Sequence, residues 1–97
     1  MLSKQDKYRL RAIANPFKPV VIIGKDGLTE NIIVAIKDVI KSQELIKISV
    51  LKTYDGLPIK ELGELICTTI DANLIFTVGR VMTIYKKNKD INHYGVK

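Results

Sequence analysis

A short apolar run that ends between two glycines constrains this chain more than any other feature. The segment from Lys18 to Thr29 reads KPVVIIGKDGLT. Its apolar part, Val20 to Ile23, is too short for a helix and is typical of a central strand buried on both faces. Pro19 fits the first position of such a strand, which need not donate a hydrogen bond. We therefore expect a buried strand that leads directly into a glycine-bracketed loop.

The loop that follows has the composition of an anion site at the start of a helix. Gly24 and Gly27 allow the backbone to turn tightly or to approach a ligand closely, and Lys25 lies between them. Thr29 is a suitable N-cap for the next helix, whose N-terminus carries a partial positive charge. Together these groups favour phosphate oxygens. Asp26 would repel phosphate if it pointed inward, so we expect its carboxylate to cap its own loop backbone.

Three interpretations of this loop compete. Glycines three residues apart most often mark only a tight turn. A free nucleotide is disfavoured, because Gly24 has no Gly-x-Gly partner and Leu28 and Thr29 stand where a P-loop needs lysine and then serine or threonine. A nucleic-acid backbone fits, since GxxG loops are a known way of clamping one. The loop therefore predicts either a simple turn or a contact with a polymeric phosphate.

The positive charge of the chain lies near its two ends. The net charge is +6. Residues 1–25 hold six basic residues and one acidic residue, residues 26–72 hold five and eight, and residues 73–97 hold five and one. If the two ends lie on one side of the fold, that side is a positive face with an acidic back. Such a face indicates a polyanionic partner, and the alternative is a merely solvated surface.

The composition describes one small domain that we expect in the cytoplasm. The chain has 97 residues, 46% of them hydrophobic and 27% charged, which fits a single domain over residues 1–97. Cys67, the only cysteine, excludes an internal disulfide, and its apolar flanks predict a small core residue in a reducing cytosol. No apolar segment has the length of a secretion signal or a membrane span. We therefore expect an unexported protein that does not enter the membrane.

Hydrophobic periodicity predicts seven elements. The expected helices cover residues 3–14, 30–42 and 59–71, and the expected strands cover residues 20–23, 45–51, 73–78 and 81–86. This order favours right-handed parallel crossovers, followed by an antiparallel hairpin that turns at Gly79 and Arg80. We expect an α/β fold, αβαβαββ, with a four-stranded mixed sheet packed against helices. The core covers about residues 3–87, and residues 88–97, which lack periodicity, are expected to form a mobile tail.

Further basic side chains accompany the loop. Lys4, Lys7 and Arg11 fall on one arc of the first helix, and Lys18 extends this stripe toward the loop. Lys47 lies on the polar side of its strand, where it either reaches a ligand on the open side of the sheet or is merely solvated. The candidate contacts are therefore Lys4, Lys7, Arg11, Lys18, Gly24, Lys25, Asp26, Gly27, Lys47, Arg80 at the hairpin tip and Lys86 after the last strand.

Three motifs in this chain resemble one family. The segments KPVVIIGKDGLTE from Lys18, ELIKI from Glu44, and VGRV from Val78 with IYK from Ile84 stand in the order and spacing of the bacterial YhbY family of CRM (chloroplast RNA splicing and ribosome maturation) domains. The resemblance covers about residues 3–87. It implies an RNA-binding domain with a fold similar to the C-terminal domain of bacterial translation initiation factor 3. The GxxG loop of the family, which is implicated in RNA contact, corresponds to residues 24–27.

Two segments depart from the family pattern. Many relatives end the third helix in a glycine-containing turn, whereas here the chain continues from Ile70 through Asp71, and we expect Asn73 to take any left-handed cap. The last strand often ends in Tyr-Arg, and here it ends in Tyr85-Lys86. Lysine keeps the charge but lacks the planar fork with which arginine binds phosphate through two hydrogen bonds.

Aromatic groups for stacking on bases are scarce. The chain has four tyrosines, two phenylalanines and no tryptophan. Tyr8, Tyr54 and Tyr85 are the best stacking candidates, although each is equally consistent with a place at the edge of the core. We therefore expect recognition of RNA shape rather than of base sequence.

The family resemblance implies a protein that binds large-subunit (23S) ribosomal RNA in pre-50S particles and assists ribosome assembly. We expect a monomer with no cofactor, metal ion or small-molecule substrate. The alternative is a protein-binding adaptor that docks on a ribosomal protein or assembly factor through the acidic third helix. An enzyme is disfavoured, because His93 lies in the tail and no nucleophile–base pair or metal-binding acid cluster is recognisable. The salt dependence of binding distinguishes the RNA-binding protein from the adaptor, because phosphate contacts weaken steeply with ionic strength and apolar docking does not.

Overall fold

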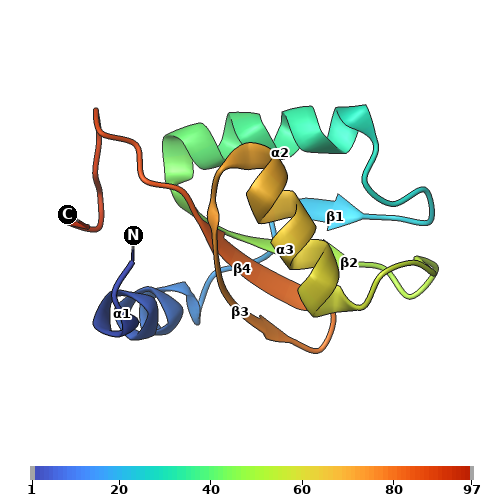
Figure 1. Cartoon of the computed structure of the whole chain (residues 1–97), viewed down its shortest axis with the longest axis horizontal. Helices are drawn as coiled ribbons and strands as arrows, with labels where there is room; N and C mark the ends of the chain where they lie inside the picture. Colours follow the sequence, from blue (N-terminus) through green and yellow to red (C-terminus); the bar gives the residue numbers. More distant parts are fainter. Residues whose placement is uncertain (1, 97) are drawn as a thin grey trace.

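A four-stranded sheet with the strand order β1-β2-β4-β3 organises the fold. The structure is a computed structural model that describes residues 2–96. Along the chain the elements are α1 (Lys4–Ala14), β1 (Val21–Ile23), α2 (Glu30–Gln43), β2 (Leu45–Val50), α3 (Ile59–Ile70), β3 (Asn73–Val78) and β4 (Val81–Tyr85) (Figure 1). β1 runs parallel to β2, whereas β4 is antiparallel to both β2 and β3. The predicted αβαβαββ order and the mixed sheet are confirmed.

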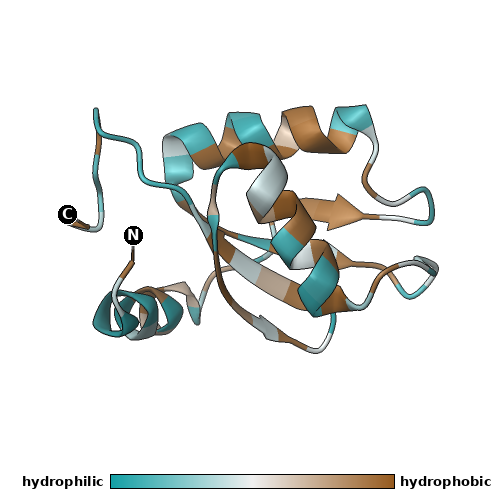
Figure 2. Cartoon of the chain, viewed as in Figure 1, coloured by the Kyte–Doolittle hydropathy of each residue, from teal (hydrophilic) through white to brown (hydrophobic). Residues whose placement is uncertain are grey.

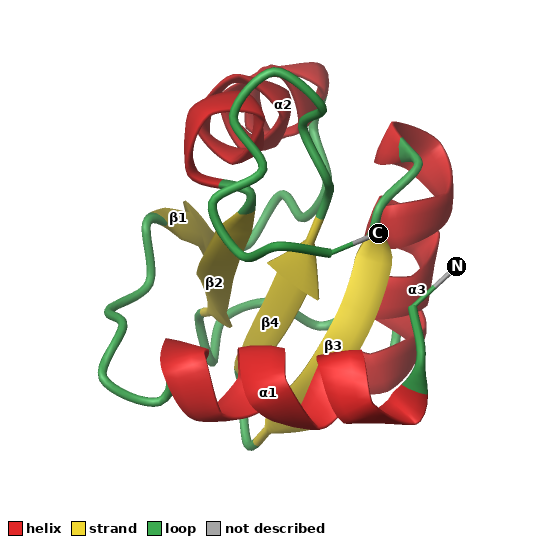
Figure 3. Ribbon diagram, turned by 90° about the vertical axis from the view of Figure 1, so that its left-hand side faces the viewer, coloured by secondary structure: helices red, strands yellow, loops and turns green. Residues whose placement is uncertain are grey.

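Alternation along β2 divides the helices between the two faces of the sheet. Ile46 and Ile48 are buried in the larger core cluster, which α2 and α3 cover. Leu45 belongs to a second, smaller cluster together with Leu10 and Ala14 of α1. Figure 3 shows α1 lying across one end of the sheet, away from α2. Two helices therefore cover one face, and a single helix covers part of the other.

Short-range sequence signals explain where the elements begin. The Ser3 hydroxyl accepts a hydrogen bond from the Asp6 N–H at 3.0 Å and caps α1, as predicted. Thr29 caps α2 in the same way, because its hydroxyl accepts a hydrogen bond from the Ile32 N–H at 3.2 Å. Gly79 has a φ of 57° in the turn between β3 and β4, which confirms the predicted hairpin. Each boundary is set by residues that are three or fewer positions apart.

β1 is an edge strand, so the prediction that residues 20–23 are buried on both faces was wrong. The strand pairs only with β2. Val21 and Ile23 are buried in the larger core cluster, whereas Val20 is 45% and Ile22 57% exposed on the opposite face. Figure 2 shows that the strand is hydrophobic along its length. An apolar run therefore indicates a strand here without indicating that both of its faces are covered.

The end of α3 also differs from the prediction. Asp71, not Asn73, takes the left-handed conformation, with φ 58° and ψ 52°. Aspartate tolerates this region better than most residues because its side chain is short and polar. Asn73 instead begins β3. Within the helix, Gly63 allows close packing on the sheet, since a Cβ atom there would lie 3.0 Å from Leu74 Cδ1.

Residues 88–96 pack against the fold, so the expectation of a mobile tail was wrong for them. Val96 is 3% exposed and joins Leu10 in the smaller cluster. Tyr94 packs edge-on against Tyr85, with ring centroids 6.3 Å apart. The segment lacks periodicity because individual contacts hold it, rather than a repeating apolar face.

A buried carboxylate fastens this segment to the end of α2. Glu44 is fully buried and has a φ of 63°. Its carboxylate accepts hydrogen bonds from the N–H groups of Asn88 at 2.8 Å and His93 at 2.6 Å. Its carbonyl oxygen accepts a third from the Lys86 N–H at 2.8 Å. The bonds from Asn88 and His93 satisfy a buried carboxylate that would otherwise be costly.

We predict that Glu44→Gln lowers the free energy of unfolding by about 2 kcal/mol and loosens residues 88–96. An amide has one oxygen, so its NH₂ group would face one of the two N–H donors. Urea unfolding measures the loss of stability, and amide hydrogen exchange at Asn88 and His93 reports on the tail. Glu64→Gln, at an exposed position in the interior of α3, is the matched control. Unchanged protection at both amides in Glu44→Gln would contradict this role.

Tyr85 carries a hydroxyl that the fold leaves without a partner. The residue is fully buried, and its oxygen makes no hydrogen bond within the described residues. Burial, with the nearby Glu44 carboxylate, raises the pKa of Tyr85 from 10.0 to about 12. The folded protein therefore holds this proton more tightly than the unfolded chain. Stability from this source is complete below about pH 10 and is lost as the pH rises toward 12.

We predict that Tyr85→Phe is neutral at pH 7 or raises the free energy of unfolding by up to about 1 kcal/mol, because it removes an unpaired buried hydroxyl. The variant should also lose less stability than the wild-type protein as the pH rises from about 10 toward 12. Urea unfolding at pH 7 and over this rise in pH tests both statements. Tyr8→Phe, at a site that is 69% exposed, should follow the wild-type curve. A marked loss of stability in Tyr85→Phe at pH 7 would mean that the hydroxyl has a partner in solution.

Candidate functional site

The loop of residues 24–27 is a tight turn directly after β1. The Gly27 N–H donates a hydrogen bond to the Gly24 carbonyl oxygen at 3.0 Å, and Gly27 has a φ of 70°. Lys25 and Asp26 are exposed at the tip. Their N–H groups have no hydrogen-bond partner within residues 2–96. The turn therefore presents two backbone donors and the Lys25 ammonium to solvent, just before the N-terminus of α2.

Asp26 does not play the role that was expected of it. Its carboxylate makes no hydrogen bond within residues 2–96, so the predicted capping of the loop backbone was wrong. The hydrogen bond between the two glycines already closes the turn. The carboxylate instead places a negative charge beside the exposed Lys25.

Tyr54 packs beneath the loop. A Cβ atom on Gly27 would lie 3.0 Å from Tyr54 Cε1, so glycine is required there by this contact as well as by its φ. The Tyr54 hydroxyl accepts a hydrogen bond from the Leu57 N–H at 2.9 Å. The ring therefore supports the loop from behind.

Arg80 secures the same region and does not project from the hairpin tip. Its guanidinium donates hydrogen bonds to the carbonyl oxygens of Val50 at 3.0 Å, Leu51 at 2.6 Å and Tyr54 at 3.4 Å. These bonds hold the β3–β4 hairpin against the segment that carries Tyr54. A direct RNA contact by Arg80 stays a prediction, but the donors that it would need are used within the fold.

Three adjoining hollows bring most of the predicted cations together. Lys4, Lys7 and Arg11 line the hollow beside α1. Arg11 also lines the next hollow with Lys47, and Lys47 lines the third with Lys18. We name these five residues the basic band. The predicted stripe on α1 and Lys18 thus lie on one side of the fold, and Lys47 links them.

Lys47 combines the two alternatives that the sequence left open. It is half-buried, and its Nζ donates a hydrogen bond to the Asn15 carbonyl oxygen at 3.2 Å, just after α1 ends. The same side chain lines the central hollow on the less covered face of the sheet. Lys47 therefore ties β2 to the end of α1 and remains positioned next to a ligand-sized space.

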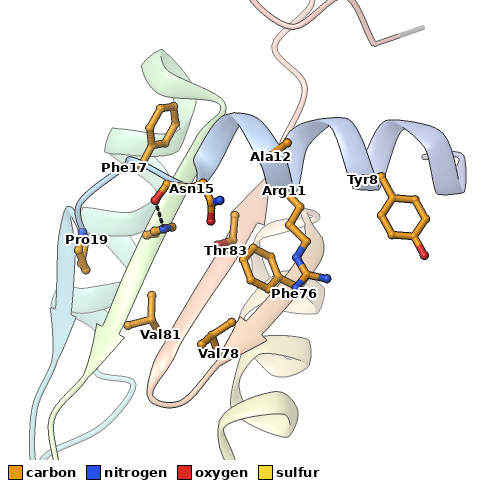
Figure 4. Close-up of a pocket in the computed structure, with 11 residues that line it drawn as sticks. Tyr8, Arg11, Ala12, Asn15, Phe17, Pro19, Phe76, Val78, Val81 and Thr83 are labelled. Carbon is orange, nitrogen blue, oxygen red and sulfur yellow. Dashed lines mark hydrogen bonds between the residues drawn. The ribbon is translucent and has the colours of Figure 1, made fainter.

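The central hollow is a groove of about 530 Å³ between α1 and the sheet. In Figure 4, α1 forms one wall with Tyr8, Arg11 and Asn15, and Phe76 and Thr83 lie on the sheet below. The Arg11 guanidinium carbon lies 4.4 Å from the centroid of the Phe76 ring, a cation–π contact. Sequence analysis missed Phe76, Asn15 and Thr83 as site residues. Only the placement of Phe76 and Thr83 on the strand face opposite the larger core cluster, with Asn15 at the end of α1, could have indicated them.

The floor of the groove continues into an open, largely apolar part of the sheet. Ile22, Ser49, Val81 and Val78 form one row across the four strands. Ile22 is 57% and Val78 59% exposed. This open face separates the basic band from the GxxG loop, which lies at the other end of β1. At about 3.3 Å per residue, Lys18 and the loop are roughly 20 Å apart.

Lys86 belongs to a different part of the surface. Its Nζ donates a hydrogen bond to the Ile70 carbonyl oxygen at 2.6 Å, which satisfies an acceptor at the C-terminus of α3. It lines a hollow on the side of α2 and α3 whose other basic residues are Lys37, Lys41, Lys87 and Lys89. The two ends of the chain therefore form separate positive patches instead of one face. An RNA contact by Lys86 stays a prediction.

The tyrosines divide clearly once the fold is known. Tyr85 is fully buried and is excluded as a stacking residue. Tyr54 supports the loop, and Tyr8 is 69% exposed at the wall of the groove. Tyr8 is therefore the one candidate of the three that stands ready for stacking.

Other kinds of site find little support in residues 2–96. No three His, Cys, Asp or Glu side chains in this range gather closely enough to hold a metal ion. Cys67 is buried, as expected, and burial with the nearby Glu64 raises its pKa to about 12, so the thiol stays protonated at neutral pH. Within the same range, no helix combines the length and the hydrophobicity that crossing a membrane requires.

Known proteins of similar sequence match this chain over nearly its whole length. It is 30% identical over 90 residues to the probable RNA-binding protein YqeI of Bacillus subtilis, with 93% of each chain covered. It is 29% identical over 93 residues to an RNA-binding protein of Haemophilus influenzae, with 92% of this chain and 89% of that one covered. It is 26% identical over 91 residues to the probable RNA-binding protein PA4753 of Pseudomonas aeruginosa, with 94% and 86% covered.

A solved structure and a family model agree with these relatives. The solution structure of the Staphylococcus aureus protein SAV1595, a candidate RNA-binding protein, superposes with a TM-score of 0.79 at 35% identity and covers 92% of both chains. Residues 2–86 match the family model of the CRS1 / YhbY (CRM) domain. The motifs around the GxxG loop, the fold and the extent of the match lead to one conclusion: this chain belongs to the CRS1/YhbY (CRM) domain family.

Proposed function

We propose that this protein binds RNA, with its GxxG loop and its basic band holding the phosphate backbone. The observation that carries the proposal is their arrangement at the two ends of β1. Two unpaired N–H groups and Lys25 lie at one end of β1, and the basic band lies at the other. Backbone donors at a turn, with cations nearby, are suited to phosphate oxygens. The proposed act is binding without catalysis.

The charges of the basic band support RNA binding. Among the described residues the only ion pair joins Arg9 to Asp6, so no member of the basic band is neutralised by a carboxylate. Cations without such partners can release counterions from a nucleic acid. This release supplies most of the sequence-independent affinity of a protein for nucleic acid. The relatives named as RNA-binding proteins, and the family itself, point to the same kind of partner.

The more specific proposal is that the RNA is large-subunit (23S) ribosomal RNA in assembling pre-50S particles, in the cytoplasm. It follows from the family resemblance. A monomer with cations at both ends of one strand can bridge backbone segments roughly 20 Å apart, which suits folded RNA better than a short single strand. Such bridging would help ribosomal RNA to adopt its assembled shape.

A protein-binding adaptor is the second candidate. The outer side of α3 favours it, because Leu65 is 45% exposed beside Glu61 and Glu64. A basic ribosomal protein would suit this acidic surface. The α3 surface lies away from the basic band, so the two functions are compatible.

We predict that Lys18→Gln and Lys25→Gln each weaken binding to a labelled ribosomal RNA hairpin and lower the slope of log K against log salt concentration by about one. Fluorescence anisotropy between about 50 and 200 mM salt measures both quantities. Lys60→Gln, the same charge change on α3, is the matched control and should leave the slope unchanged. Asp26→Asn should strengthen binding, since it removes a negative charge from the loop. Equal effects of Lys60→Gln and Lys25→Gln would show that binding depends on net charge alone, and would refute the assigned surface.

We also predict comigration of the protein with immature large ribosomal subunits when cell lysate is fractionated on a gradient at low salt, and its loss from them at high salt. Sequencing of crosslinked RNA should recover large-subunit ribosomal RNA. Migration only as a free protein, with no enrichment of RNA, would contradict the assembly role. Salt-resistant comigration would favour the adaptor instead.

A further inference from the structure

The groove between α1 and the sheet contains groups that phosphate binding does not require. Its wall and floor include the Tyr8 and Phe76 rings and the polar side chains of Asn15 and Thr83. A surface that only held phosphates would need cations and N–H donors. The groove therefore has a chemistry of its own, which the proposed phosphate contacts leave unexplained.

Arg11 and Phe76 form a flat, cationic platform in this groove. The guanidinium lies over the ring at 4.4 Å, and Arg11 has no ion pair within residues 2–96. Aromatic rings and stacked guanidinium planes are the surfaces on which proteins stack unpaired RNA bases. Tyr8, which lies one turn earlier on the same wall and is 69% exposed, adds a second ring at the edge.

Polar groups with hydrogen-bonding capacity lie next to this platform. The Asn15 side chain is exposed and makes no hydrogen bond within the described residues, while its carbonyl oxygen holds Lys47 in place. A side-chain amide can donate and accept at once, which suits the edge of a base. Thr83 lies on the strand floor and is only 1% exposed, so it shapes the groove rather than offering its hydroxyl to a ligand.

Size and charge restrict the occupant. A volume of about 530 Å³ lies within the range of small-ligand sites. Every charged residue that lines the groove is basic, namely Arg11 and Lys47, and Lys4, Lys7 and Lys18 line the hollows beside it. An anionic chain with a flat aromatic group fits these features. An apolar peptide would leave the cations without partners.

We propose that this groove holds one unpaired nucleobase of the bound RNA, stacked beside Tyr8 and the Arg11–Phe76 platform, with its edge toward Asn15. The flanking phosphates contact the basic band. This inference rests on the proposed RNA binding and extends it, because the protein then distinguishes a bulged or looped nucleotide from a continuous duplex. A paired base keeps its faces inside the stack and cannot enter.

The test compares two labelled RNA hairpins that differ only in one bulged uridine. The wild-type protein should bind the bulged hairpin about tenfold more tightly, since stacking one base on an aromatic side chain contributes affinity of this order. Tyr8→Ala and Asn15→Ala, both at exposed positions, should lose most of this preference and keep their affinity for the paired hairpin. Lys25→Gln should weaken binding to both hairpins and keep the preference. Ultraviolet crosslinking from the bulged base should label Tyr8 or Phe76.

The outcomes separate this inference from the function on which it rests. Equal binding of the two hairpins, or a preference that Tyr8→Ala and Asn15→Ala both leave intact, would overturn the base site while RNA binding stands. Failure to bind either hairpin at low salt would overturn both proposals. A parallel loss of affinity for both hairpins in Tyr8→Ala would show that the residue serves the fold or the backbone contact, and not a base.

Discussion

One helix has to cover a whole face of the sheet, and a single helix is too narrow for that. At 1.5 Å per residue, α1 is about 16 Å long, enough to cross four strands spaced about 4.8 Å apart. A helix about 10 Å wide, however, covers only about three residues of each strand, and β2 and β3 have six residues each. The uncovered remainder is the open face, and the edge of α1 becomes the wall of the groove.

The segment after β4 holds α1 against this sheet. Val96 and Tyr94 pack in the same cluster as Leu10 and Ala14, and Glu44 binds the backbone of the segment through two hydrogen bonds. One side of α1 is therefore buried by residues from the other end of the chain. The other side carries Tyr8 and most of the basic band, so the C-terminal segment indirectly positions the proposed RNA surface.

Cations that look alike in the sequence have different surroundings in the fold. Arg80 and Lys86 donate to backbone carbonyl oxygens and stabilise a hairpin and a helix end. Lys25 and Lys18 are exposed and make no hydrogen bond within the described residues. A carbonyl oxygen within reach of a cationic side chain offers a local partner that competes with phosphate. Composition counts these charges equally, and only their neighbours distinguish support from binding.

Sequence by itself determined the order of the elements, the caps at Ser3 and Thr29, the hairpin at Gly79 and the GxxG turn. All of these depend on residues a few positions apart, so local periodicity and turn chemistry carry the information. Tertiary structure alone decided the edge position of β1, the groove, and the roles of Arg80 and Glu44. Those features join residues 29 and 49 positions apart, such as Arg80 with Leu51 and Glu44 with His93. No local pattern encodes such contacts, because they exist only once the helices and strands have packed.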